Sequence, residues 1–133
     1  MPLGVGPEVS RVDTAVLRKL AVWTVEQALE IQAIPAPTFA EEKRARKVAA
    51  GFAALGLEGV QMDALSNVYA RLPGESSRGC LMISAHTDTV LASGTDLTVS
   101  RTGDRLAGPG LGDNNVGVIE GGNGLMIVAA GGV

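Results

Sequence analysis

The sequence predicts an α/β fold, a three-layer sandwich in which helices cover a β-sheet. Two segments in the first half of the chain, 13–33 and 39–55, carry apolar residues at helical spacing. Short runs typical of strands fill the second half. One of them, 79–86, is continuously apolar between a glycine and polar residues, as expected of a strand buried on both faces of a sheet. Helices followed by strands around such a central strand favour a layered arrangement.

The composition is that of a single globular domain. The chain has 133 residues, of which 46% are hydrophobic and only 3% are aromatic, so alanine and aliphatic side chains must form the core. The net charge of −3 gives no reason to expect nucleic acid or a membrane surface as a partner. Residues 1–12 read as a loose leader without a secretory signal, and we expect a cytoplasmic protein. The single cysteine, Cys80, is expected to be a buried, inert thiol.

The first predicted helix, 13–33, can be capped by Asp13 or Thr14. The prolines within 34–37 end it, because each disfavours helix at the residue before it. Its apolar positions follow helical spacing and predict one buried face. They are Val16, Leu20, Val25, Leu29 and Ile31.

The second predicted helix covers about 39–55. Thr38 and Glu41 have the spacing of a capping box at its start, and Gly56 supplies its stop. We expect apolar side chains to point inward and charged ones to form a solvated face. The inward set is Phe39, Val48, Phe52 and Leu55. The charged set is Glu41, Glu42, Lys43, Arg44, Arg46 and Lys47.

Beyond the second helix the pattern changes to that of short strands. We expect them within 57–64, within 66–74, within 79–86, on both sides of a turn at 102–104, and at 125–130. A glycine-rich loop, 108–118, precedes the last one. This loop has neither the glycine spacing of a dinucleotide site nor the Lys-Ser/Thr pair of a phosphate loop.

His86, the only histidine, lies at the end of the apolar run 79–86 and two residues before Asp88. Side chains two apart on a strand point to the same side, and ligands of α/β sheets bind beyond the carboxyl ends of the strands. The imidazole can bind a metal through one nitrogen while the carboxylate accepts the proton of the other. Taken alone, the pair is more often a histidine satisfied by a local hydrogen bond.

Asp113 lies in the glycine-rich loop, where tight turns let the backbone approach a ligand closely. Zinc accepts carboxylate oxygen together with imidazole nitrogen, and one carboxylate can bridge two ions. The alternative is that Asp113 caps the segment that follows it, or belongs to an ordinary turn.

The two motifs occur in an order that resembles one enzyme family. "LMISAHTDTV", followed after a short hairpin by "LAGPGLGDNN", resembles the metal-site motifs of the aminoacylase / peptidase T / carboxypeptidase family of dizinc metallopeptidases. The similarity extends over about residues 13 to 118, including a first helix that ends in Ile-Pro. The resemblance implies a mixed, mostly parallel sheet and two zinc ions, for which cobalt or manganese can substitute.

The resemblance also implies roles for three residues. His86 resembles a ligand of one zinc ion, Asp88 the catalytic carboxylate that orients this histidine, and Asp113 the carboxylate that bridges both ions. The intact family hydrolyses peptides or N-acyl amino acids.

Other residues of the family site have no counterpart here. The family continues with a Glu-Glu pair, which supplies the general base and a zinc ligand, and with a second histidine and a lid or dimerisation domain. After Asp113 the only glutamate is the single Glu120. We therefore expect 13–133 to be the N-terminal part of a catalytic domain, inactive as an isolated chain. The alternatives are a noncatalytic α/β structural or interaction module, and a complementing fragment that needs a C-terminal half.

Overall fold

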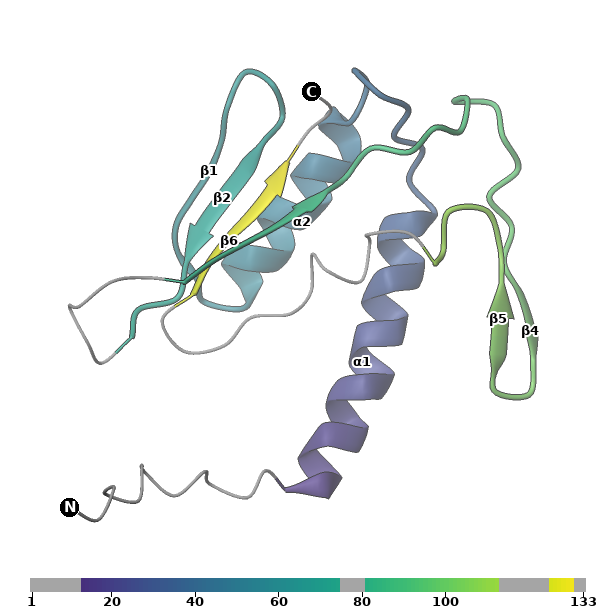
Figure 1. Cartoon of the computed structure of the whole chain (residues 1–133), viewed down its shortest axis with the longest axis horizontal. Coiled ribbons are helices and arrows are strands. Elements are labelled where there is room, and N and C mark those ends of the chain that lie inside the picture. The colour runs from purple at the N-terminus through teal and green to yellow at the C-terminus, as the bar shows by residue number, and fades with distance from the viewer. Residues whose placement is uncertain (1–12, 75–80, 113–124, 131–133) are drawn as a thin grey trace, which may run out of the picture.

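A computed structural model describes residues 13–74, 81–112 and 125–130. The leader 1–12, Cys80, Asp113 and Glu120 lie outside these ranges. The described residues form two helices and six strands, as Figure 1 shows, so the α/β class is confirmed. The elements are α1 (Thr14–Gln32), α2 (Glu42–Ala54), β1 (Glu58–Met62), β2 (Val68–Arg71), β3 (Leu81–His86), β4 (Ser100–Thr102), β5 (Arg105–Ala107) and β6 (Leu125–Ala130).

The main sheet has four strands in the order β1-β2-β6-β3. Strand β2 is antiparallel to both β1 and β6, whereas β3 is parallel to β6 in a register that pairs His86 with Ala130. The sheet is mixed, as expected, but its described pairings do not confirm a mostly parallel sheet. Strands β4 and β5 form a separate hairpin around Gly103, whose φ of 61° suits a residue without a side chain.

Helix α2 packs on the sheet and forms the core with it, whereas α1 extends away from the sheet (Figure 1). The core is built mainly of small and aliphatic residues because the sequence has few aromatics. Its buried members are Ile31, Ala45, Val48, Phe52, Val68, Ala70 and Ala85. The elements described here give one helical layer on the sheet, so a three-layer sandwich is not confirmed by them. None of the described helices is both long and apolar enough to cross a membrane.

The predicted buried face of α1 is wrong over most of its length. Asp13 caps the helix as expected, with its Oδ1 accepting from the Ala15 amide at 2.8 Å. Ile31 is buried at the other end, but Val16, Leu20 and Val25 are exposed. The apolar period indicates a face for packing, and in the described structure only the C-terminal end of the helix has a partner for it.

The predicted capping box of α2 is also wrong. The residue after Thr38 is Phe39, which has a left-handed backbone with φ of 71°, and the helix begins only at Glu42. Glu41 Oε1 accepts from the Phe39 amide at 2.7 Å instead of reaching Thr38. As a result, the Phe39 side chain is 80% exposed, not buried as predicted.

The two faces of α2 match the prediction in part. Val48 and Phe52 are buried as expected, whereas Leu55 is exposed. Of the charged residues assigned to a solvated face, Glu41 and Arg44 are buried. Glu41 accepts from the Phe39 amide two residues before it, and Arg44 donates to the Thr87 carbonyl of a distant segment, which the local charge pattern does not reveal.

Strand β3 is not buried on both faces. It lies at one end of the strand order in the described sheet, and Leu81 and Met82 are 64% and 58% exposed. Ala85 is its buried residue. The apolar run therefore predicted a strand correctly, but in the described structure no neighbouring layer covers its first half.

Candidate functional site

The candidate site lies where β3 ends. The strand stops at His86, and Asp88 follows two residues later. His86 Nδ1 lies 3.2 Å from Asp88 Oδ1 and 3.1 Å from the Asp88 carbonyl oxygen, so the two side chains meet as predicted. The imidazole is 44% exposed and the carboxylate 20%. A ring that donates from Nδ1 to Asp88 presents its Nε2 as the metal-binding nitrogen. The same contact also fits the alternative, a histidine that is simply satisfied by a local hydrogen bond.

A third side chain joins the pair. Thr38 Oγ1 donates to Asp88 Oδ2 at 2.7 Å, so the Asp88 carboxylate is held on one oxygen by Thr38 and faces His86 with the other. The spacing of Thr38 and Glu41 predicted a helix cap and gave no indication of this contact. The two residues are 50 positions apart, and no local pattern indicates their approach.

Backbone contacts fix the turn that carries Asp88. The Thr89 amide donates to the Ala36 carbonyl at 2.7 Å, and Pro37 and Thr89 form an isolated parallel bridge. Thr87 and Thr89 are buried. The link between the two helices and the turn after β3 therefore run side by side, which brings Thr38 next to Asp88.

Arg44 anchors the same two segments from inside. It is 1% exposed, and its Nη1 donates to the Thr87 carbonyl at 2.9 Å. Nε and Nη2 donate to the Ile34 carbonyl at 3.0 and 2.6 Å, and Nη2 also reaches the Gln32 carbonyl at 3.3 Å. A guanidinium presents several donors in a rigid fork, so one side chain can hold three carbonyls. Arg44 thus ties the end of α1 and the helix link to the turn at Thr87.

The glycine-rich loop is held against this turn. Buried Gln32 donates from Nε2 to the Pro109 carbonyl at 2.8 Å and to the Leu97 carbonyl at 3.0 Å. Gly110 lies so close that an added Cβ would be 3.7 Å from Thr89 Cγ2. The described part of the loop ends at Gly112, one residue before Asp113, and it runs beside the segment that bears Asp88.

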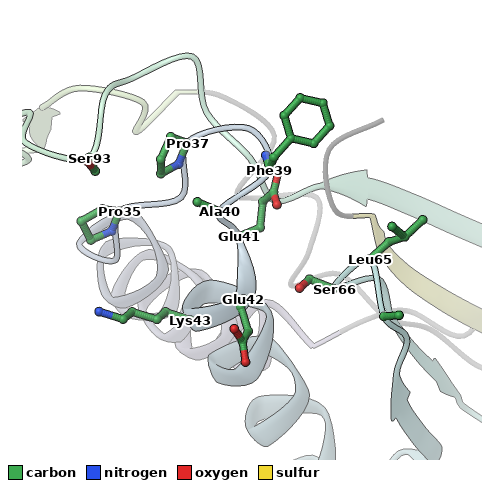
Figure 2. A pocket seen from close by; sticks show the side chains of 11 residues that line it. Pro35, Pro37, Phe39, Ala40, Glu41, Glu42, Lys43, Leu65, Ser66 and Ser93 are labelled. Carbon is green, nitrogen blue, oxygen red and sulfur yellow. Dashed lines mark hydrogen bonds between the residues drawn. The ribbon is translucent and has the colours of Figure 1, made fainter.

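A hollow of about 800 Å³ opens beside Thr38. Figure 2 shows it with Pro35 and Pro37 on one side, and Leu65 and Ser66 on the other.

Ser66, like Phe39, has a left-handed backbone, with φ of 64°. The turn before Ser66 is held by Asp63, whose pKa is lowered chiefly by the hydrogen bond from the Asn67 side chain and further by backbone amides.

The described residues do not by themselves form a metal site. Within 13–74, 81–112 and 125–130, no three His, Cys, Asp or Glu groups are placed to hold one ion together. His86 provides one exposed imidazole with an orienting carboxylate, which is a suitable donor for zinc. Asp113, the third predicted site residue, lies outside the described residues.

Comparison with known proteins supports a particular fold. Neither protein-family models nor curated protein sequences match the chain. Among solved structures it is similar to a tripeptidase from Staphylococcus aureus subsp. aureus Mu50, with a TM-score of 0.65 and 20% identity over 82% of this chain and 36% of that one. It is also similar to the aminopeptidase PepT from Bacillus cereus ATCC 10987, with a TM-score of 0.63 and 18% identity over 80% of this chain and 35% of that one.

A third match is the aminoacylhistidine dipeptidase from Vibrio alginolyticus, with a TM-score of 0.58 and 20% identity over 80% of this chain and 27% of that one. The chain shares its fold with part of these peptidases. At the level of fold, this confirms the resemblance to the aminoacylase / peptidase T / carboxypeptidase type of enzyme. The chain spans between 27% and 36% of the length of the three structures.

Proposed function

We propose that this chain is the N-terminal portion of a zinc-dependent metallopeptidase or amidohydrolase that hydrolyses peptide or N-acyl amide bonds. The observation that carries the proposal is the His86–Asp88 pair at the carboxyl end of β3, within a fold shared with a tripeptidase, an aminopeptidase and a dipeptidase. Ligands of open α/β sheets bind at this end of the strands, so the pair occupies a position suited to chemistry.

Each predicted site residue has a role in this proposal. His86 binds one metal ion through Nε2, because its Nδ1 faces Asp88. Asp88 fixes the orientation of the ring. Asp113 would supply a carboxylate to the metal site, and the loop that precedes it lies beside Thr89 at Gly110. Zinc, or cobalt or manganese in its place, supplies the Lewis acidity that makes a bound water nucleophilic at neutral pH.

The donor set of the isolated chain is incomplete for a two-metal reaction. The sequence has one histidine and no Glu-Glu pair after Asp113 to act as general base and ligand. We propose that residues 13–133 form a partial catalytic domain behind a leader, 1–12, and that the remaining ligands and a lid or dimerisation domain belong to further polypeptide. On its own the chain binds zinc weakly and does not turn over substrate. We place the complete enzyme in the cytoplasm and give it the three-layer, mostly parallel sheet of the family.

A complementing fragment is the second candidate, and the exposed surface of the chain favours it. Leu81 and Met82 on β3, and Val16 and Leu20 on α1, are apolar and exposed, as expected of surfaces that a larger domain covers. The remaining alternative is a noncatalytic module. Mixing the chain with the C-terminal portion of a related enzyme, with dipeptides and N-acyl amino acids as substrates, separates the two. Association that restores hydrolysis supports complementation, whereas failure to associate supports the module.

Isothermal titration with zinc tests the site itself. The chain should bind zinc weakly, and His86→Ala should abolish the binding because no other imidazole is present. Asp104→Asn, in the exposed hairpin turn, removes one negative charge away from the site and is the matched control. Equal binding by His86→Ala and the unaltered chain contradicts the assignment.

A further inference from the structure

We infer that Thr38 is a positioning residue of the candidate metal site: its hydroxyl sets the plane of the Asp88 carboxylate and so holds the His86 ring in its metal-binding orientation. This deepens the site and, for its effect on metal, rests on the proposed function above.

The contacts of the Asp88 carboxylate carry the inference. Its Oδ2 accepts from Thr38 Oγ1 at 2.7 Å, and its Oδ1 lies 3.2 Å from His86 Nδ1. The two oxygens belong to one rigid plane, so rotation of the carboxylate away from Thr38 also moves Oδ1 away from the ring. Hydrogen bonds to an ionised carboxylate are stronger than those between neutral groups. Thr38 therefore restricts rotation of the carboxylate away from His86 Nδ1, which also lies 3.1 Å from the Asp88 carbonyl oxygen.

The position of Thr38 is itself fixed, which a positioning role requires. Thr38 follows the link that is tied to the turn after β3 through the Ala36–Thr89 hydrogen bond and through Arg44. The Ala40 amide closes a tight turn by donating to the Pro37 carbonyl at 2.8 Å. The hydroxyl is thus presented from a backbone that is held on both sides.

The backbone of Phe39 explains why the hydroxyl points at Asp88. A threonine at this spacing from a glutamate normally caps the helix that follows. The left-handed Phe39, with φ of 71°, breaks that arrangement, so α2 begins at Glu42 and Thr38 faces the site instead. Left-handed residues other than glycine are uncommon and occur preferentially at functional sites. The Phe39 ring is exposed, so burial of the ring does not account for the left-handed backbone.

Two substitutions at Thr38 separate its hydroxyl from its bulk. Thr38→Val keeps the shape and removes the donor, whereas Thr38→Ser keeps the donor. Thr38 is exposed, so both variants should unfold at the temperature of the unaltered chain. Thr38→Ala also removes the hydroxyl. It is included because alanine adds no new methyl group that the surrounding residues would have to accommodate.

The first readout needs no metal. Because the chain has one histidine, the nitrogen signals of its imidazole in NMR are unambiguous, and they report which nitrogen carries the proton at alkaline pH. The Nδ1–H form should predominate in the unaltered chain and in Thr38→Ser. It should lose population to the Nε2–H form in Thr38→Val and Thr38→Ala. An unchanged tautomer ratio in both deletions overturns the inference.

The second readout is titration with cobalt(II), followed by its visible absorption. Loss of groups that orient a metal ligand weakens binding by about 10- to 100-fold, and Thr38 acts one contact further out. We therefore expect about three- to tenfold weaker binding for Thr38→Val, with rescue by Thr38→Ser. If cobalt binds through His86 and Thr38→Val matches the unaltered chain in affinity and tautomer, the positioning role is wrong and the proposed function stands. If the chain binds no cobalt but the tautomer ratio responds, the metal function is wrong and the positioning of His86 stands.

Discussion

Replacing Arg44 with methionine is expected to destabilise the fold more than any change at a charged residue on the surface of α2. Arg44 is buried, and its guanidinium donates to the carbonyls of Gln32, Ile34 and Thr87. Methionine has a similar length but no donor. Each buried carbonyl left without a donor costs about 1–3 kcal/mol. Relief from burying a charge offsets part of the sum, so we expect a net loss of about 2–4 kcal/mol in the free energy of unfolding.

Unfolding in urea, followed by circular dichroism, measures this loss. Arg46→Met on the same helix is the matched control, because its ion pair with Glu42 is exposed and should contribute less than about 0.5 kcal/mol. Arg44→Lys should fall between the two, since an ammonium group does not have the donor fork that spans three carbonyls. If Arg44→Met shifts the urea midpoint no further than Arg46→Met does, the hydrogen bonds of Arg44 do not stabilise the fold and the prediction is refuted.

Three further predictions concern Gly108 in the glycine-rich loop, the turn that Asp63 holds, and the exposed strand β3. Gly108→Ala should lower the free energy of unfolding by about 1–3 kcal/mol in urea, because the new Cβ would lie 2.7 Å from Val99 Cγ2. The hydrogen bond from the Asn67 side chain is the main cause of the lowered pKa of Asp63. The ionised carboxylate therefore stabilises the turn fully above the ordinary pKa of about 3.9. This stabilisation is lost as the pH falls through the lower pKa of the folded state. On that acidification the Asn67 amide should lose protection from hydrogen exchange, measured relative to the intrinsic exchange rate at each pH. We expect the exposed apolar strand β3 to promote self-association in solution, and Leu81→Lys should reduce it in sedimentation without lowering the urea midpoint.

Each of these has a matched control. Gly94→Ala meets no atom within 4 Å of the new Cβ and should leave stability unchanged; if it weakens the fold as much as Gly108→Ala, close approach is not the cause. Asp63→Asn should remove the acid response, and a response that persists would assign it to another group. Val90→Lys also replaces an exposed apolar residue, but outside β3. Equal effects of Val90→Lys and Leu81→Lys on self-association would exclude a specific role for the strand.

The start of α1 and the end of α2 could be predicted from the sequence because local chemistry sets them. Asp13 caps α1, and Gly56, with φ of 76°, follows the end of α2 as expected. The hairpin around Gly103 is also where the turn residues indicated it. The approach of His86 to Asp88 was predicted from the alternation of a strand that extends through Asp88, whereas β3 ends at His86 and the contact forms just beyond it. The role of Asp113 stays a prediction.

Contacts between distant segments could not be predicted in this way. Thr38 has the spacing of a helix cap, yet its hydroxyl binds a carboxylate 50 residues away. Arg44 lies among charges typical of a solvated face, yet it donates to three backbone carbonyls, one of them 43 residues away in the sequence. The period of apolar residues in α1 indicates a packing face but not its partner. In each case the deciding group lies far away in the sequence, where spacing carries no signal.

The central claim is that His86 is a metal ligand, and X-ray absorption at the zinc edge tests it most directly. Because the chain has one histidine, the zinc-loaded protein should show scattering from a single imidazole, with nitrogen at about 2.0–2.1 Å and oxygen donors completing the shell. The imidazole contribution should disappear in His86→Ala. A spectrum of oxygen donors alone in the unaltered chain would contradict the assignment of His86, and with it the proposed metallopeptidase site.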